Sequence, residues 1–347
     1  MHNKSTDLPE NARALIVRTD RIGDVVLSLP VFTSIARAFP KWRVTALTRD
    51  YTRGLFSGRG DVDDIISFDS GSSHIPWGVF FKLLKKIKDQ EFDVAIVLYS
   101  NFSVALLLAM ARIPVRIGPA TKLAQLFLTY RITQRRSKGE RHEADHNLDL
   151  LAPLNIPPVK QASIARPDNA KNIFIKQSGR PLVGIHPGCG GSSPNWPETY
   201  YSDLIQEISA SGVDVAVTGA DHEREMVERI VGRSGCKPQI YIGSDKIEEL
   251  IGALALLDVF VGPSTGPLHI ASALGVPVVG IYSPILVCLP QRWGPRGKND
   301  TAITPPGVPV CHRCVGDKCP HWDCMEKIGV KRVKGAILSR IKSPVNL

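Results

Sequence analysis

The fold of this chain is decided by residues 257–282, which read LDVFVGPSTGPLHIASALGVPVVGIY. The apolar residues 259–261 are typical of the end of a buried strand, and residues 262–266 are typical of a tight turn. An apolar helix over 268–274 and a second strand over 276–282 follow. The stretch therefore predicts a strand, a loop, a helix and a strand, which is the repeating unit of an open α/β sheet.

The turn of this unit predicts an anion site. Gly262, Ser264, Thr265 and Gly266 stand just ahead of the helix, where unpaired backbone N–H groups and the positive helix end favour a phosphate. The alternative is that glycine and proline only form a sharp corner and that His269 is an ordinary core histidine, because short Gly-rich motifs also match by chance.

The same unit recurs through the second half of the chain. Strands are expected at 182–186, 213–218 and 240–243, and each ends in a loop that carries glycine, as in 187–201 and 219–223. Because the carboxyl ends of parallel strands meet at one edge of a sheet, these loops crowd together. That edge is the natural place for a nucleotide.

The first half begins with a comparable unit. Residues 14–17 predict a strand and residues 25–39 a helix, and RTDRIGD at 18–24 forms the loop between them. Open α/β sheets bind ligands at such a loop. Asp24 at the start of the helix either caps free N–H groups or serves as a general base that faces a cleft, with Asp20 in reserve.

The segment 155–181 is rich in proline and charge and lacks a long apolar period, which indicates a domain boundary. We therefore expect a Rossmann-like domain over 1–160, a linker over 161–180, and a second Rossmann-like domain over 181–325. The basic residues 326–347 are expected to form a helix and a tail, with packing on the N-terminal domain as one option.

Composition points to an acidic partner. The formal net charge is +10, and residues 112–146 hold eight Lys or Arg against three Asp or Glu. This basic segment is either a solvated loop or the binding surface for an anionic acceptor, through Arg116, Arg135 and Arg136. No run of 18 apolar residues occurs and the start of the chain is polar, so a cytosolic protein is expected.

Four of the seven cysteines cluster near the C-terminus, in CHRCVGDKCPHWDC. Cys311, Cys314, Cys319 and Cys324 could hold a structural zinc ion, because close pairs of thiolates suit tetrahedral zinc. Reduced thiols or a local disulfide are the alternatives. His142 and His146 have metal-like spacing, but no Cys or Glu pattern completes a site, so a structural role is expected for both.

Several stretches together resemble the heptosyltransferases of glycosyltransferase family nine. They are RTDRIGDVVLSLPVFTSIARAFP at 18–40, SPNWPETYYSDLI at 193–205, GADHEREMVERI at 219–230, GPSTGPLHIASALGVPVVGIY at 262–282, RWGP at 292–295 and CMEKI at 324–328. The resemblance implies the α/β GT-B fold, in which two Rossmann-like domains have parallel sheets that face each other across a cleft.

The resemblance also implies residue roles. The family's general base falls on Asp24, and its ribose-binding carboxylate falls on Glu223. Its donor diphosphate turn falls on Thr265, Gly266, Pro267 and His269. From the loops themselves we also expect Gly188 and Ser264 in the donor site. From the basic residues of the first half we expect an acceptor site that comprises Arg18, Arg21, Arg116, Arg135 and Arg136.

Two departures from the family pattern concern the donor. The chain has Pro194 where members usually carry a phosphate-binding lysine, and Ser264 where many have aspartate. Lys246 or Arg292 could supply the missing positive charge.

These observations predict an inverting, metal-independent glycosyltransferase. It would move a heptose or related sugar from a nucleotide diphosphate donor to the inner core of lipopolysaccharide. The expected donor is ADP-heptose. We expect a cytoplasmic monomer, peripheral to the inner membrane, with no nucleic-acid partner. The alternatives are a related transferase that uses another nucleotide sugar and a non-enzymatic protein that binds zinc and nucleic acid.

Overall fold

The computed structural model describes residues 7–69, 75–168, 170–191, 193–243 and 246–341. Contacts between residues divide the chain into two compact units. The first unit consists of Met1–Arg136 and Glu143–Ala162, and the second of Ser137–His142 and Ser163–Leu347. Residues of the expected linker pack within the second unit, where Ile164 donates its N–H to Ala273 O and Phe174 is buried.

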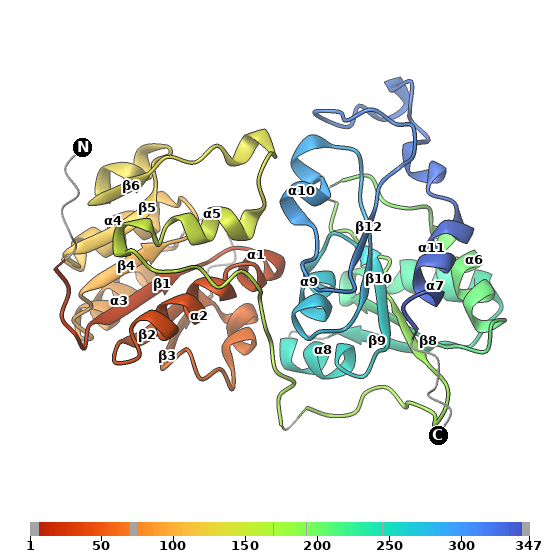
Figure 1. The fold of residues 1–347 in the computed structure, drawn as a ribbon, viewed down its shortest axis with the longest axis horizontal. Helices are drawn as coiled ribbons and strands as arrows, with labels where there is room; N and C mark the ends of the chain where they lie inside the picture. Colours follow the sequence, from red (N-terminus) through yellow and green to blue (C-terminus); the bar gives the residue numbers. More distant parts are fainter. Residues whose placement is uncertain (1–6, 70–74, 169, 192, 244–245, 342–347) are drawn as a thin grey trace. The chain divides into compact units, whose positions relative to one another are not determined.

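The first unit is built on a parallel sheet of six strands in the order β3-β2-β1-β4-β5-β6 (Figure 1). The strands are β1 (Arg13–Val17), β2 (Arg43–Arg49), β3 (Asp64–Phe68), β4 (Val94–Val97), β5 (Val115–Pro119) and β6 (Tyr130–Ile132). The chain leaves β1 toward β2 on one side and returns to β4 on the other. The carboxyl ends of β1 and β4 therefore flank a topological switch point, where open sheets bind ligands.

Helices cover both faces of this sheet. They are α1 (Ile22–Val26), α2 (Leu29–Ala38), α3 (Trp77–Lys88), α4 (Phe102–Met110) and α5 (Glu143–Asp149), with short 3-10 helices η1 (Asp50–Phe56), η2 (Leu123–Phe127), η3 (Arg136–Lys138) and η4 (Ala152–Leu154). The apolar sides of α3 and α4 pack on Leu15 and Val17 in one core. The neighbouring helices α2 and α5 contribute none of their buried side chains to that core, and they cover the opposite face.

The single helix expected over residues 25–39 is two helices in the structure. α1 ends at Val26 and α2 begins at Leu29, so the prediction was wrong at the junction. Pro30 lies in the first turn of α2, and proline cannot donate an N–H to the preceding turn. Ser28 instead donates its hydroxyl to Val25 O.

The second unit repeats the topology of the first. Its parallel sheet has the order β12-β11-β10-β7-β8-β9 (Figure 1). The strands are β7 (Leu182–Ile185), β8 (Asp214–Ala220), β9 (Gln239–Gly243), β10 (Val259–Pro263), β11 (Val278–Ile281) and β12 (Thr301–Ile303). Its helices are α6 (Glu198–Ser209), α7 (Arg224–Ser234), α8 (Ile247–Leu254), α9 (Gly266–Ala273), α10 (Pro290–Trp293) and α11 (Val330–Leu338), and its short 3-10 helices include η5 (Asp221–Glu223), η6 (Leu286–Cys288), η7 (Gly316–Lys318) and η8 (Cys324–Lys327). The α/β class and the two Rossmann-like sheets predicted from the sequence are confirmed.

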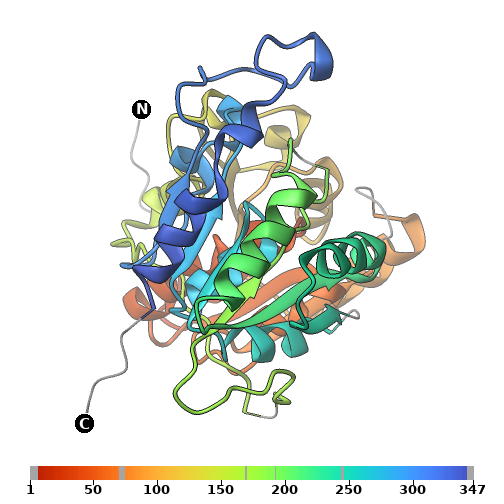
Figure 2. The same cartoon turned by 90° about the vertical axis from the view of Figure 1, so that its right-hand side faces the viewer.

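The C-terminal helix α11 belongs to the second unit. Its fully buried Val333 and Ile337 join the core that β7, β8 and α6 share. Figure 2 shows α11 beside α6, and the two helices are in contact. The apolar stripe of this helix is therefore buried within the second unit, and packing on the N-terminal domain stays a prediction. Within the described residues, no helix combines the length and the apolar character that a bilayer crossing requires.

Candidate active site

The loop after β1 carries a buried arginine at the switch point of the first sheet. Arg18 continues β1, and its N–H pairs with Leu47 O beside β2. Its side chain is only 1% exposed and crosses to β4, where Nη1 donates to Leu98 O at 3.3 Å. The guanidinium therefore lies at the edge where a doubly wound sheet binds its ligand.

Each of the three nitrogens of this guanidinium donates at least one hydrogen bond. Nε donates to Asp20 at 2.6 Å, Nη1 also donates to Asn147 at 2.9 Å, and Nη2 donates to Asp24 at 2.5 Å. Nη2 also lies 3.6 Å from Glu143 Oε1. Burial lowers the pKa of Arg18, but the three carboxylates outweigh it and hold the pKa above its usual value. Arg18 is thus a permanent buried cation whose hydrogen-bonding capacity is used within the protein.

Asp24 faces this cation from the first turn of α1. The helix has no side-chain cap, so the capping role is not the one that its carboxylate plays here. Burial raises the pKa of Asp24 to about 6, Arg18 opposes that rise, and the charges of Asp20 and Glu143 add to it. A carboxyl group with a pKa near neutrality can accept a proton at physiological pH more readily than an ordinary aspartate.

Glu143 and Asn147 complete the site and were missed in the sequence. Both lie on α5 at a spacing of four residues, which places them on one face of the helix. Asn147 Oδ1 accepts from Arg18, while its amide donates to Leu27 O at 3.1 Å. In the sequence, their four-residue spacing was the only indication that Glu143 and Asn147 act together. His142 and His146 have the same spacing, and all four side chains are buried.

The five expected acceptor arginines separate into two groups. Arg136 donates to Glu143, Gln134 and Leu98 O, so it supports the same network as Arg18. Arg116 donates to Phe127 O and Ile113 O, and it pairs with Ala95 near the amino end of β4, away from the switch point. The guanidinium groups of Arg18, Arg116 and Arg136 therefore make hydrogen bonds inside the unit, and direct acceptor binding by these three residues stays a prediction. Arg21 and Arg135 are exposed.

In the second unit, Gly188 and Glu223 meet at the equivalent switch point. Gly188 follows β7, and a Cβ atom at this position would overlap the carboxylate of Glu223. Glu223 accepts from Ala220 N at 2.9 Å and lies 3.8 Å from His186 Nε2. The glycine therefore makes room for a carboxylate that the turn after β8 holds in place.

The predicted phosphate turn lies between β10 and α9. Thr265 is the N-cap of α9, and Ser264, Gly266 and Pro267 are half-buried around it. His269, one turn into the helix, is 4% exposed, and burial lowers its pKa to about 3, with His142 adding to the effect. The imidazole is therefore neutral at physiological pH and contributes no positive charge.

Arg292 is better placed than Lys246 to supply a cation near this turn. Arg292 is on α10, which follows β11, the neighbour of β10, and its guanidinium lies 4.8 Å from the Trp293 ring centre. Lys246 follows β9 at the far edge of the sheet. Adjacent strands bring their carboxyl-end loops together, which favours Arg292.

The cysteine cluster lies after β12 and packs partly on the second unit. Cys311 N donates to Pro284 O at 3.0 Å, and Cys324 is buried. Burial raises the pKa of both thiols, and the neighbouring cysteines raise it further. In the part of the chain that the structure describes, no three Cys, His, Asp or Glu side chains form a ligand set for a metal. The zinc site stays a prediction.

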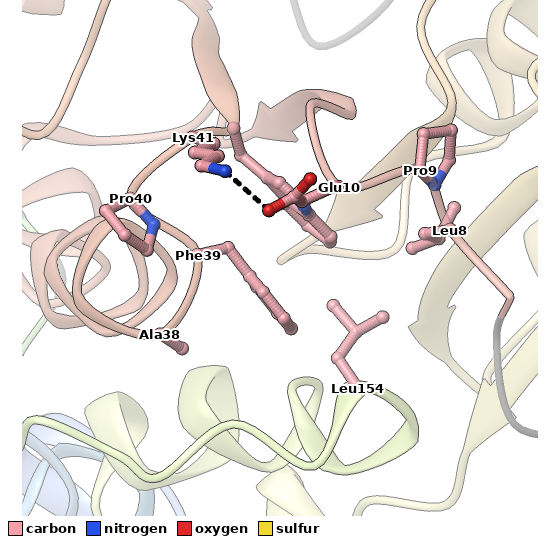
Figure 3. A pocket seen from close by; sticks show the side chains of 9 residues that line it. Leu8, Pro9, Glu10, Ala38, Phe39, Pro40, Lys41 and Leu154 are labelled. Carbon is pink, nitrogen blue, oxygen red and sulfur yellow. Dashed lines mark hydrogen bonds and ion pairs between the residues drawn. The ribbon is translucent and has the colours of Figure 1, made fainter.

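A separate cavity of about 350 Å³ lies at the amino edge of the first sheet. Phe39, Trp42 and Leu154 line it, and Lys41 pairs with Glu10 at 2.6 Å beside it (Figure 3). Glu10 precedes β1 and Lys41 precedes β2, whereas Arg18 and Asp24 follow β1. The cavity is therefore distinct from the candidate active site.

Comparisons with known proteins agree with this architecture. The model of glycosyltransferase family 9 (heptosyltransferase) matches residues 80–320. A putative glycosyltransferase of Haemophilus influenzae is 30% identical over 307 residues, which cover 84% of this chain and 88% of the relative. Lipopolysaccharide heptosyltransferase 2 of Escherichia coli is 24% identical over 292 residues, or 78% of this chain and 83% of that protein.

Solved structures show the same fold. The structure of the Escherichia coli ADP-heptose lipopolysaccharide heptosyltransferase II matches with a TM-score of 0.77 at 19% identity, over 95% of this chain and 98% of that one. The GT-B fold is thereby confirmed, and the non-enzymatic zinc and nucleic-acid binder is ruled out by the family match. The residues that match the family model include both β4 of the first sheet and the phosphate turn of the second. This chain therefore belongs to glycosyltransferase family 9, the heptosyltransferases.

Proposed function

We propose that this glycosyltransferase moves a heptose from ADP-heptose to the inner core of lipopolysaccharide, with inversion at the anomeric carbon. The relatives' names supply the donor and the acceptor, since they include lipopolysaccharide heptosyltransferases and an ADP-heptose enzyme. The observation that carries the chemistry is the Asp24 carboxyl, whose pKa of about 6 suits a base and whose position Arg18 fixes.

The first unit would bind the acceptor and activate it. Asp24 takes the proton of the attacking sugar hydroxyl while that oxygen forms a bond to the anomeric carbon of the donor. The bond from this carbon to the diphosphate oxygen breaks in the same step, so the configuration inverts. Arg18 acts as a positioning residue because it donates to Asp24, and Asn147 supports Arg18 by accepting from it.

The second unit would bind the donor. The free N–H groups at the start of α9, around Thr265 and Gly266, face the diphosphate and stabilise its charge as it leaves. Pro267 has no N–H and helps only by shaping the turn. Glu223, which Gly188 makes room for, accepts from the ribose hydroxyls. Arg292 replaces the phosphate-binding lysine that Pro194 has displaced.

The acceptor is anionic, and we assign the binding of its negative charge to Arg21 and Arg135. Both residues are exposed in the first unit. We place the reaction at the cytoplasmic face of the inner membrane, with the enzyme as a peripheral monomer. No metal takes part in this chemistry. If the four cysteines hold zinc, the ion has a structural role, because thiolates close the coordination sphere.

A different nucleotide sugar is the second candidate for the donor. It is favoured by Pro194 and Ser264, which depart from the family pattern at the donor site. A different phosphate environment changes which donor the turn accepts, while the Asp24 chemistry stays the same.

The test is a transfer assay with purified protein. ADP-heptose is offered with lipopolysaccharide from a strain that lacks core heptose, beside ADP-glucose, UDP-glucose and GDP-mannose at equal concentration. We expect release of one ADP for each heptose added, and little release from the other donors. Preferential turnover of another donor would replace ADP-heptose by that sugar. Tight binding of every donor without any transfer would contradict the proposed enzyme.

A further inference from the structure

Five large apolar side chains stand exposed on one part of the first unit. Trp77 and Phe81 on α3 are 71% and 55% exposed, and Phe102 at the start of α4 is 49% exposed. Leu123 and Leu126 on η2 are 67% and 63% exposed. Single exposed apolar residues are common, but several on neighbouring elements indicate an interaction surface.

The three elements lie side by side. α4 contacts both α3 and η2, and the Phe102 ring packs edge to face on Phe127 of η2 with 5.4 Å between ring centres. On α3, Trp77 and Phe81 stack at 6.1 Å, and Lys85 follows them at the same four-residue spacing. Residues four apart share one side of a helix, so the apolar pair continues directly into positive charge.

α3 and the residues 94–139 carry only positive formal charges. α3 carries Lys82, Lys85, Lys86 and Lys88 and no acidic residue. The next 46 residues after Asp93, 94–139, contain seven Lys or Arg and neither Asp nor Glu. An exposed Trp and Phe beside lysines on an amphipathic helix match the pattern of helices that lie in the interface of an anionic bilayer.

The position of these elements links them to the active site. α3 and α4 each begin after the carboxyl end of a strand, β3 and β4, and η2 follows the carboxyl end of β5. Arg18 and Asp24 follow the carboxyl end of β1 in the same sheet. Trp77 and Phe102 therefore stand at the edge of the sheet where the acceptor would react.

We propose that α3, the start of α4 and η2 form a docking face for an anionic phospholipid bilayer, with Trp77, Phe81, Phe102, Leu123 and Leu126 entering the interface and the α3 lysines pairing with lipid phosphates. Docking through this face would bring a membrane-held acceptor to the edge of the sheet that carries Asp24. The choice of a bilayer over another acidic surface rests on the proposed lipopolysaccharide acceptor.

The experiment measures binding of the full chain to vesicles without donor or acceptor. Vesicles of phosphatidylglycerol and phosphatidylethanolamine are compared with phosphatidylcholine vesicles by co-sedimentation, at low and high salt. We expect binding to the anionic vesicles that weakens with salt. The double variant W77S/F81S should lower the partition coefficient at least roughly tenfold, since each 1.4 kcal/mol of lost apolar burial is a factor of ten.

Two further proteins keep the test decisive. L123S/L126S removes apolar side chains from η2 and should show the same loss of binding, so the result does not depend on the folding of one variant. Trp322→Ser removes an equally exposed tryptophan, 66% exposed in the second unit, and should bind like the parent protein. Circular dichroism checks that each variant is folded.

Three outcomes would overturn the docking face. The first is that the parent protein does not bind anionic vesicles, and the second is that both double variants still bind them. The third is that the parent protein self-associates and W77S/F81S abolishes this self-association. The face would then bind a second copy of the chain. Transfer to a delipidated, water-soluble core oligosaccharide is measured in parallel. Its retention in W77S/F81S separates failure of docking from failure of the proposed transferase activity.

Discussion

Replacing Asp24 by asparagine should reduce turnover and at the same time relieve a cost to stability. Asparagine keeps the shape of the side chain and can still accept from Arg18 Nη2, but it cannot take a proton. If Asp24 is the general base, turnover falls by roughly 10²–10⁴-fold. Donor affinity should stay near that of the parent protein, because the proposed donor site is in the other unit.

The stability effect follows from the pKa of about 6 in the folded protein and 3.8 as the reference value. A raised carboxyl pKa means that the folded state holds the proton more tightly than the unfolded chain does. This contribution to stability is fully present below the unfolded pKa and is lost as pH rises through about 6. Between pH 5 and pH 8 the loss amounts to about 1.4 kcal/mol. The asparagine variant lacks this titration.

The assay is urea unfolding of both proteins at pH 5 and pH 8. The difference in unfolding free energy between variant and parent should shift by about 1.4 kcal/mol in favour of the variant at pH 8. The rate of the parent protein should rise with pH through about 6, and the variant should lack that limb. Asp20→Asn is the control, and it should keep the limb. Turnover of Asp24→Asn within a factor of a few of the parent, with folding intact, would refute the assignment and move the search to Asp20.

Three further predictions concern other parts of the chain. Gly188→Ala should displace the Glu223 carboxylate and weaken donor binding roughly tenfold to a hundredfold by calorimetry, while Gly232→Ala, which has open space, should not. Arg135→Glu should raise the acceptor KM at low salt and less at high salt, whereas Arg136→Glu should lower the melting temperature because it places a carboxylate beside Glu143. If residues 311–324 hold zinc, metal analysis should find about one ion per chain and a chelator should lower the melting temperature; four titratable thiols without metal would refute the site.

The fold was predictable because its strongest sequence patterns are local. The central strands β1, β4, β7 and β10 are buried apart from Arg13 at the start of β1, and they consist of short apolar runs bounded by turns. The strand β5 and its neighbour β6 at the edge of the sheet were not predicted. Arg116 and Arg131 interrupt their apolar pattern, and the segment was interpreted as a basic stretch. The first two residues of β5 and all three of β6 are not fully buried, so the sequence of this segment carries little apolar periodicity.

The site was predictable only in part, for a related reason. The rule that ligands bind beyond the carboxyl ends of strands is enough to single out the Asp24 loop and the turn before α9. Arg18 was predicted to bind the acceptor because it lies in the loop after the first strand, and its complete burial was not expected, since charged residues are rarely buried completely. Its partner Asn147 lies 129 residues further along the chain, and one sequence holds no information about a contact at that separation.

The buried arginine also explains how Asp24 reaches its pKa. Burial has the largest effect on this carboxyl and raises its pKa, whereas the charge of Arg18 lowers it. Because Arg18 is shared among Asp20, Asp24 and Glu143, its charge offsets only part of the burial, and the pKa settles at about 6. Glu143 therefore tunes the pKa of the base, although the proposed mechanism gives it no contact with the sugar. Glu143→Gln should accordingly lower the pH of the rising limb, because removing a negative neighbour favours the ionised form of Asp24.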